Sequence, residues 1–209
     1  MTNEMECPTA TVLIITSSDD VHSNEMMPKL ENSGARIVRL NTDQLTSRCS
    51  ELIFTDKKDD SEIIIDDITF KLSEITSVWY RRPETPETKV EDPNQRQFAE
   101  YELGELLRQC YSRLDHALWV SSYQALDAAR RKLPQLHIAR SLGMVVPKTL
   151  ATNSPRRAHS FYNECDGRII YKTLYAPVIK PSDGPELWGV PTTIIGKDHI
   201  DQIDLIRHT

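Results

Sequence analysis

Glycine is scarce in this sequence, with 7 glycines among 209 residues. The chain contains no G-x-G-x-x-G and no G-x-x-x-x-G-K-[ST] pattern, so the two common glycine-rich phosphate loops have no basis in it. If this protein binds a nucleotide, lysine side chains rather than a glycine loop must hold the phosphates.

Metal-binding spacings are missing as well. The 4 cysteines lie far apart without a C-x-x-C pair, and the 6 histidines show neither H-x-x-x-H nor H-E-x-x-H spacing. We therefore expect free thiols, no metal ligand, and no catalytic residue that the sequence can name.

Long apolar runs and an excess of positive charge are also lacking. No run reaches the roughly eighteen apolar residues that cross a membrane, and no basic segment leads into an apolar stretch at the start. The formal net charge is −6, from 25 basic and 31 acidic residues, which argues against binding to a nucleic-acid backbone. These features predict a cytoplasmic protein with no membrane and no nucleic-acid partner.

Short β-branched apolar runs are present, and they alternate with helical patterns. The runs at 11–16, 36–40 and 75–80 are typical of strands buried on both faces of a parallel sheet. The residues Ser17 to Asp19 offer helix N-caps after the first run, and Gly34 is placed to end that helix. Short strands over 50–72, separated by acidic turns, predict an antiparallel meander, and apolar spacing over 94–114 predicts a long amphipathic helix.

The second half predicts shorter elements. A helix that begins near Ser121 should break just before Pro134, because proline removes a backbone donor and clashes with the preceding turn. Ser154 and Pro155 are typical of another helix start. Strands are expected at 118–120, 168–174, 176–180 and 192–195, and a last helix over 198–207.

Arg81 and Arg82 follow the strand that ends at Tyr80, at the edge of an open α/β sheet where ligands collect. Arginine suits carboxylate or phosphate groups. Adjacent residues point to opposite faces, so at most one of the two serves a given site. A structural salt bridge with the glutamate-containing loop that follows is an equal alternative.

Lys172 lies among apolar residues in an expected strand, where an ammonium group must reach solvent or meet an anion. Lys132 closes the basic cluster 130–132 next to the expected helix break. By themselves, these positions also fit a surface lysine on an edge strand and a solvated helical face.

Taken together, the motifs resemble the amino-terminal part of the ATP-grasp ligases that make graspetides, the microviridin-type synthetases. The matching pieces, in order, are VWYRRP at 78–83, LWV at 118–120, ARRKLPQL at 129–136, VPKTLATNSP at 146–155 and IIYKTL at 169–174.

The resemblance implies a pre-ATP-grasp, Rossmann-like α/β domain with a small antiparallel meander over 1–115. It implies the first subdomain of an ATP-grasp fold over 116–209, without the second lobe. Family members hold nucleotide phosphates with two lysines, which match Lys132 and Lys172, and Arg81 and Arg82 become candidate substrate contacts.

ATP and Mg²⁺ are the implied cofactors, although no Mg²⁺ ligand or adenine-contacting residue can be placed on this chain. The implied partner is a precursor or leader peptide, and a homodimer is compatible with the resemblance. Such ligases convert a side-chain carboxylate of the peptide to an acyl phosphate, which a hydroxyl or amine attacks to give a lactone or lactam.

We expect that the isolated chain is not a competent ligase. It would then be a truncated product, or a split subunit whose missing lobe is on another chain. The alternatives are a non-catalytic module that binds a leader peptide and an unrelated flavodoxin-like or regulatory domain.

Overall fold

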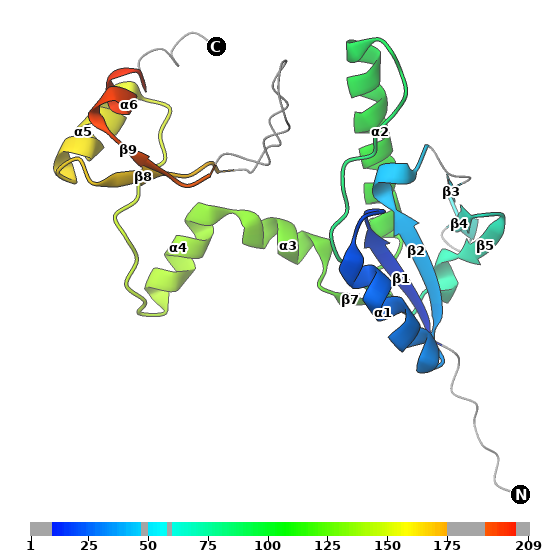
Figure 1. Ribbon diagram of the computed structural model, residues 1–209. Helices are drawn as coiled ribbons and strands as arrows, with labels where there is room; N and C mark the ends of the chain where they lie inside the picture. The colour runs from blue at the N-terminus through cyan, green and yellow to red at the C-terminus, as the bar shows by residue number, and fades with distance from the viewer. Residues whose placement is uncertain (1–9, 47–49, 58–59, 175–190, 204–209) are drawn as a thin grey trace, which may run out of the picture. The chain divides into compact units, whose positions relative to one another are not determined.

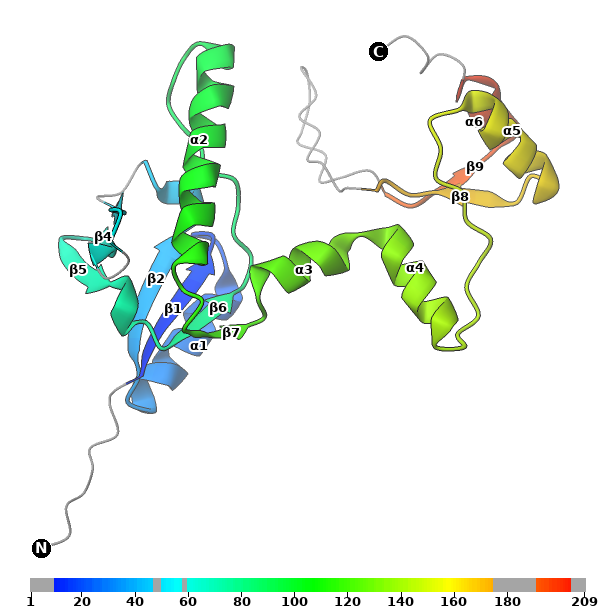
Figure 2. The same cartoon turned by 180° about the vertical axis from the view of Figure 1, so that it is seen from behind.

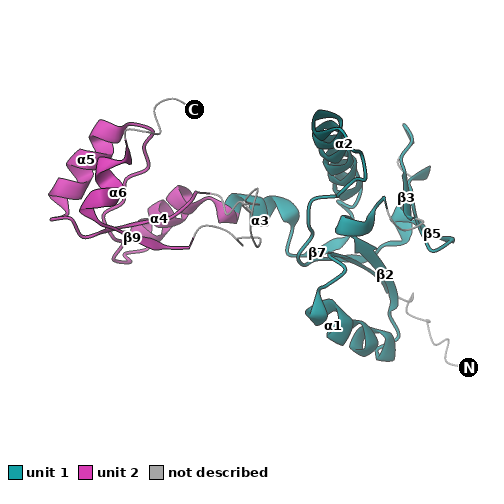
Figure 3. Cartoon of the chain, turned by 45° about the horizontal axis from the view of Figure 1, so that its top comes forward, with its two compact units in different colours: residues 1–128 teal, residues 129–209 magenta. Residues whose placement is uncertain are grey.

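The computed structural model describes residues 10–46, 50–57, 60–174 and 191–203. The chain divides into two compact units, Met1–Ala128 and Ala129–Thr209 (Figure 3). They are called unit 1 and unit 2 below, and each is described by itself.

A parallel four-stranded sheet is the centre of unit 1 (Figure 1). Its order is β2-β1-β6-β7, and every neighbouring pair is parallel. The strands are β1 (Thr11–Thr16), β2 (Arg36–Asn41), β6 (Ser77–Tyr80) and β7 (Leu118–Val120). In the register of the sheet, Leu13 lies between Val38 and Val78, which places apolar side chains in one continuous row.

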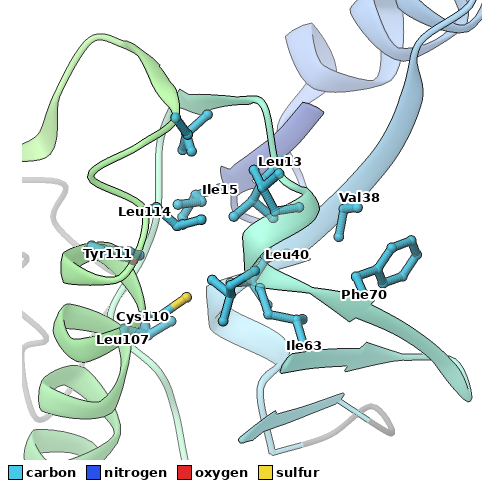
Figure 4. Packing of buried hydrophobic residues seen from close by; sticks show 14 of the residues in the cluster. Leu13, Ile15, Val38, Leu40, Ile63, Phe70, Leu107, Cys110, Tyr111 and Leu114 are labelled. Carbon is cyan, nitrogen blue, oxygen red and sulfur yellow. The ribbon is translucent and has the colours of Figure 1, made fainter. Parts of the chain in front are cut away.

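Two helices cover opposite faces of this sheet, as the front and back views show (Figures 1 and 2). They are α1 (Val21–Asn32) and α2 (Pro93–Ser112). Leu13 and Ile15 pack with Leu107 and Leu114 in one buried cluster (Figure 4). Because both faces of β1 are covered, four consecutive residues from Leu13 to Thr16 are fully buried.

A three-stranded antiparallel sheet completes the core of unit 1. Its order is β3-β4-β5, formed by β3 (Ser50–Ile53), β4 (Glu62–Ile65) and β5 (Ile68–Lys71). Ile63 and Phe70 of this meander belong to the same buried cluster as Leu40 of the parallel sheet. The expected combination of a parallel α/β sheet with a small antiparallel meander is therefore confirmed.

Helix α1 begins one residue later than the sequence suggested. Its N-cap is Asp20 rather than one of the residues Ser17 to Asp19, and the Asp20 side chain accepts a hydrogen bond from the backbone N–H of His22. The helix ends at Asn32, and Gly34 follows with a φ of +84°, a left-handed conformation that glycine adopts without strain.

Two glycine-to-alanine replacements should change stability in opposite directions. Gly34→Ala should lower the free energy of unfolding by about 1 kcal/mol, because alanine is strained at positive φ. Gly104→Ala should raise it by about 0.5 to 1 kcal/mol, since Gly104 lies inside α2 and alanine has the higher helix propensity. Urea unfolding measures both free energies. A loss of stability in both variants would contradict the different backbone roles of Gly34 and Gly104.

Unit 2 is built from short elements. They are α4 (Lys132–Ser141), α5 (Pro155–Glu164), the antiparallel pair β8 (Ile169–Tyr171) and β9 (Thr193–Ile195), and α6 (Lys197–Asp201). Helix α3 (Tyr123–Arg130) contains the division between the units. The expected strand at 176–180 lies outside the described residues.

The predicted helix break before Pro134 is confirmed. It falls at Arg131, which is the N-cap of α4, so Pro134 occupies the first turn of the new helix. Backbone N–H groups in a first turn have no partner within the helix, and proline is therefore tolerated there.

The strand expected over 168–174 is shorter than predicted. β8 ends at Tyr171, so Lys172 follows the strand instead of lying inside it. Extended pairing stops there because the described partner strand, β9, spans only 193–195.

Candidate functional site

Arg81 is held at the carboxyl end of the parallel sheet. Its backbone N–H donates to the carbonyl of Ile15 at 2.9 Å, which continues the ladder one residue beyond β6. Its Nε lies 3.9 Å from Oδ2 of Asp20, the N-cap of α1. The Asp20 side chain is 2% exposed and that of Arg81 is 30% exposed, so a buried carboxylate positions a partly accessible guanidinium.

Asp20 is the centre of a buried hydrogen-bond network. Its Oδ2 accepts hydrogen bonds from the hydroxyls of Thr16 at 2.8 Å and Ser23 at 2.5 Å. Burial alone would raise the pKa of Asp20, but the hydrogen bonds from Ser23, Thr16 and the His22 N–H, with the charge of Arg81, bring its pKa below the usual value. Asp20 therefore stays ionised and orients Arg81.

Asp20 was missed in the sequence reasoning. The run Ser17 to Asp20 offers four possible capping residues, and the weak signal for Asp20 is that it immediately precedes the first helical residue.

Arg82 lies in different surroundings. It is exposed, and its charge acts on Glu84 in the loop after β6. Desolvation and the negative charges of Asp19, Asp43 and Glu87 raise the pKa of Glu84, whereas Arg82 lowers it. Arg81 and Arg82 thus have different carboxylate neighbours.

Polar contacts tie the loops at this edge to one another. The Thr42 hydroxyl, after β2, donates to the carbonyl of Glu84 at 2.8 Å and accepts from the N–H of Glu84 at 2.8 Å. The Ser18 backbone N–H donates to Oδ1 of Asp43 at 3.0 Å. The carboxyl ends of β1, β2 and β6 therefore share one polar network, which no local sequence pattern revealed.

Unit 2 brings Lys132 to the segment that carries Lys172, although 40 positions separate them (172 − 132). The Lys132 Nζ donates to the carbonyls of Thr173 at 2.6 Å and Leu174 at 3.0 Å, the two residues after Lys172. Lys132 is half-buried at the first position of α4, and Lys172 is exposed directly after β8.

Charge is distributed unequally between the units. Residues 129–209 contain 12 lysines and arginines against 7 aspartates and glutamates, a net charge of +5. Residues 1–128 contain 13 against 24, a net charge of −11. The two lysines therefore belong to the basic unit, where an anionic ligand is electrostatically favoured.

Within 10–46, 50–57, 60–174 and 191–203, no group of three or more histidine, cysteine or acidic side chains could hold a metal ion. Across the same stretches, no helix has both the length and the apolar character needed to cross a bilayer.

The described residues thus form a parallel α/β domain with a small antiparallel sheet and a basic unit in which two lysine-bearing segments are in contact. The chain belongs to the family of the MvdD pre-ATP grasp domain, whose model matches residues 11–127. The resemblance to ATP-grasp peptide maturases is thereby confirmed. No curated protein matches the sequence significantly.

Solved structures of peptide macrocyclases are similar to this chain. Macrocyclase MdnC of Microcystis aeruginosa MRC, bound with precursor peptide MdnA, is 26% identical with a TM-score of 0.84, over 94% of this chain and 65% of that one. Macrocyclase MdnB of the same organism is 29% identical with a TM-score of 0.70, over 85% of this chain and 58% of that one.

A third structure has the same fold at lower identity. It is a RiPP-associated ATP-grasp ligase of Chryseobacterium gregarium in complex with ADP, a leader and a core peptide. The identity is 22% and the TM-score 0.75, over 96% of this chain and 61% of that one. The chain thus spans less than two thirds of the length of these three proteins.

Proposed function

We propose that this chain supplies nucleotide-phosphate and peptide contacts to an ATP-grasp ligase that crosslinks a precursor peptide. The observation that carries the proposal is the contact of the Lys132 ammonium with the carbonyls of Thr173 and Leu174, since it joins the two lysine-bearing segments. Similarity to MdnC over 94% of the chain supports the same family of reactions.

The proposed phosphate site uses two cations instead of a glycine loop. Lys132 and Lys172 would neutralise the polyphosphate of ATP, in the unit whose net charge is +5. Lys172 is exposed, so its ammonium can reach a ligand without a change of fold. Lys132 would exchange or share its carbonyl contacts with a phosphate oxygen, which is the stronger acceptor because it is charged.

The proposed peptide contacts are Arg81 and Arg82. Bound ATP would supply the phosphoryl group that turns a peptide carboxylate into an acyl phosphate, and attack by a hydroxyl or amine would release phosphate and form an ester or amide. Guanidinium groups suit the carboxylates of an acidic peptide.

Titration of the full chain with ATP and Mg²⁺ by calorimetry tests the phosphate site. Lys172→Ala and Lys132→Ala should each weaken ATP binding about ten-fold, because each removes a charge-assisted hydrogen bond. Lys197→Ala is the matched control, since Lys197 is exposed in the same unit at the start of α6, and it should change affinity less than two-fold, roughly the effect of one surface charge.

Lys172→Ala is the more direct of the two variants, because Lys132 also stabilises the chain after β8. ATP binding that is unchanged in Lys172→Ala, or a wild-type chain that does not bind ATP, would contradict the assignment.

Leader recognition without catalysis is the second candidate function. Phe98 and Tyr101 are three residues apart on α2 and are 68% and 61% exposed, which favours docking of a peptide that carries apolar side chains. A leader-type helical peptide that binds equally well with and without ATP, to a chain that has no ATP affinity, would favour this candidate.

A further inference from the structure

A pocket lies beside the point where the strand order of the parallel sheet reverses. From β1 the chain turns to β2 on one side, and after the meander it enters β6 on the other side of β1 (Figure 2). The crevice at the carboxyl ends of two such strands is the usual ligand position in open α/β sheets. The pocket has a volume of about 380 Å³, and its lining residues are His22, Glu25, Met26, Lys29, Trp79 and Arg81.

The residues that line this pocket are spaced along the chain with the periods of a helix and of a strand. His22, Glu25, Met26 and Lys29 recur at three- and four-residue intervals, so they form one stripe of α1. Trp79 and Arg81 are two residues apart and lie on the same face of β6 and its extension. Tyr80, between them, faces α2, where its ring lies 5.5 Å from that of Tyr111.

The charge of the pocket differs from that of its unit. Unit 1 carries a net charge of −11, and the pocket lining has two permanent cations, Lys29 and Arg81, and one carboxylate, Glu25. The carboxylate of Asp20, which is not part of the lining, pairs with Arg81 from behind. Because the Asp20 side chain is only 2% exposed, the accessible side of the pocket presents the two cations to an anionic group. Glu25 at the same time disfavours a phosphate, whose charge approaches −2, more than it disfavours a carboxylate.

Arg81 is positioned for such a ligand before it binds. The buried carboxylate of Asp20 contacts Nε, and the ladder hydrogen bond to Ile15 fixes the backbone. A guanidinium has four further N–H donors on its two terminal nitrogens, in a fork that matches a carboxylate. Trp79 and Met26 add an aromatic and a thioether surface, which suit an apolar side chain next to the carboxylate.

We propose that the pocket between α1 and β6 binds an acidic side chain of the substrate peptide that is flanked by an aromatic or large apolar residue. Lys29 and Arg81 contact the carboxylate, and Trp79 contacts the flanking residue. This inference rests on the proposed function, and it adds Lys29 and Trp79 as specificity-determining residues and assigns Arg81, rather than Arg82, to this contact.

Two capped hexapeptides serve as probes, Ac-Gly-Ser-Phe-Glu-Gly-Ser-NH₂ and the same peptide with Gln in place of Glu. The readout is the NMR shift of the Trp79 indole N–H in the full chain, identified with the Trp79→Phe variant. The Glu peptide should bind at least about ten-fold more tightly than the Gln peptide, because only the Glu carboxylate forms ion pairs with Lys29 and Arg81 in addition to hydrogen bonds.

Variants of the chain locate the contact. Lys29→Ala should weaken binding of the Glu peptide about five-fold, the effect expected for a partly exposed ion pair. Lys29 is exposed, so its truncation leaves the fold intact. Lys71→Ala is the matched control, since Lys71 is an exposed lysine on β5, and it should change binding less than two-fold, in the range of a remote surface charge.

Equal binding of the Glu and Gln peptides, or equal weakening by Lys29→Ala and Lys71→Ala, would overturn the inference. Displacement of the peptide from Trp79 by ATP would also overturn it, because the pocket would then be a phosphate site. The same holds if the Trp79 indole N–H signal does not shift at saturating peptide concentrations. Each result is independent of whether Lys172→Ala weakens ATP binding, so failure of this pocket and failure of the proposed phosphate site are distinguishable.

Discussion

Replacement of Ile15 by alanine should lower the free energy of unfolding of unit 1 by about 3 to 4 kcal/mol, the range for a large aliphatic side chain removed from a closed core. Ile15 is fully buried in the centre of the parallel sheet, in the cluster formed with α2 (Figure 4). Strands β2 and β6 flank β1 on both sides, so the backbone cannot collapse into the cavity. Urea unfolding followed by tryptophan fluorescence measures the loss, because Trp79 and Trp119 lie in this unit.

Ile68→Ala is the matched control for Ile15→Ala. Ile68 is also in a strand of unit 1 but is 54% exposed, so the same replacement should cost less than about 1 kcal/mol. Similar losses at the two positions would contradict the description of Ile15 as part of a closed core.

Asp20→Ala should destabilise unit 1 by about 3 kcal/mol, since it removes an N-cap and the acceptor of several buried donors. The hydroxyls of Thr16 and Ser23 would lose their carboxylate partner, and Arg81 would lose the ion that orients it. Asp20→Asn should cost less, because the amide keeps an acceptor oxygen but not the charge. Urea unfolding at pH 7 gives both values, and a wild-type stability in Asp20→Ala would contradict this role.

The contribution of Asp20 to the free energy of unfolding should decrease as the pH falls. The pKa of Asp20 is lowered in the folded protein, so the unfolded chain takes up the proton first as the pH falls. The stabilisation is complete above the ordinary aspartate pKa and disappears as the pH falls through the lower, folded value. The difference in unfolding free energy between wild type and Asp20→Asn should therefore shrink as the pH falls below the ordinary aspartate pKa, and a difference that grows in acid would contradict the lowered pKa.

Local patterns were sufficient to predict most elements of unit 1. The run from Thr11 to Thr16 is apolar on both faces, and only a strand covered on both sides satisfies such a run. Short apolar strands with acidic turns between them similarly predicted the meander. These signals are local because the residues that carry each of them lie within a few positions of one another in the sequence.

The exact ends of elements were less predictable. Any of four adjacent polar residues could have capped α1, and the choice of Asp20 depends on Thr16, Ser23 and Arg81, which the sheet brings around it. β8 stops before Lys172 because strand length depends on the partner strand, which lies more than twenty residues further along.

The sequence by itself determined the fold class, the net charge and the candidate cations, because composition and hydrophobic period are properties of short segments. Only the tertiary structure decided that Lys132 meets the carbonyls after Lys172, that Arg81 pairs with Asp20, and that Trp79 and α1 form a pocket. Such contacts join residues that are tens of positions apart. They depend on strand order and helix placement, which no local pattern specifies.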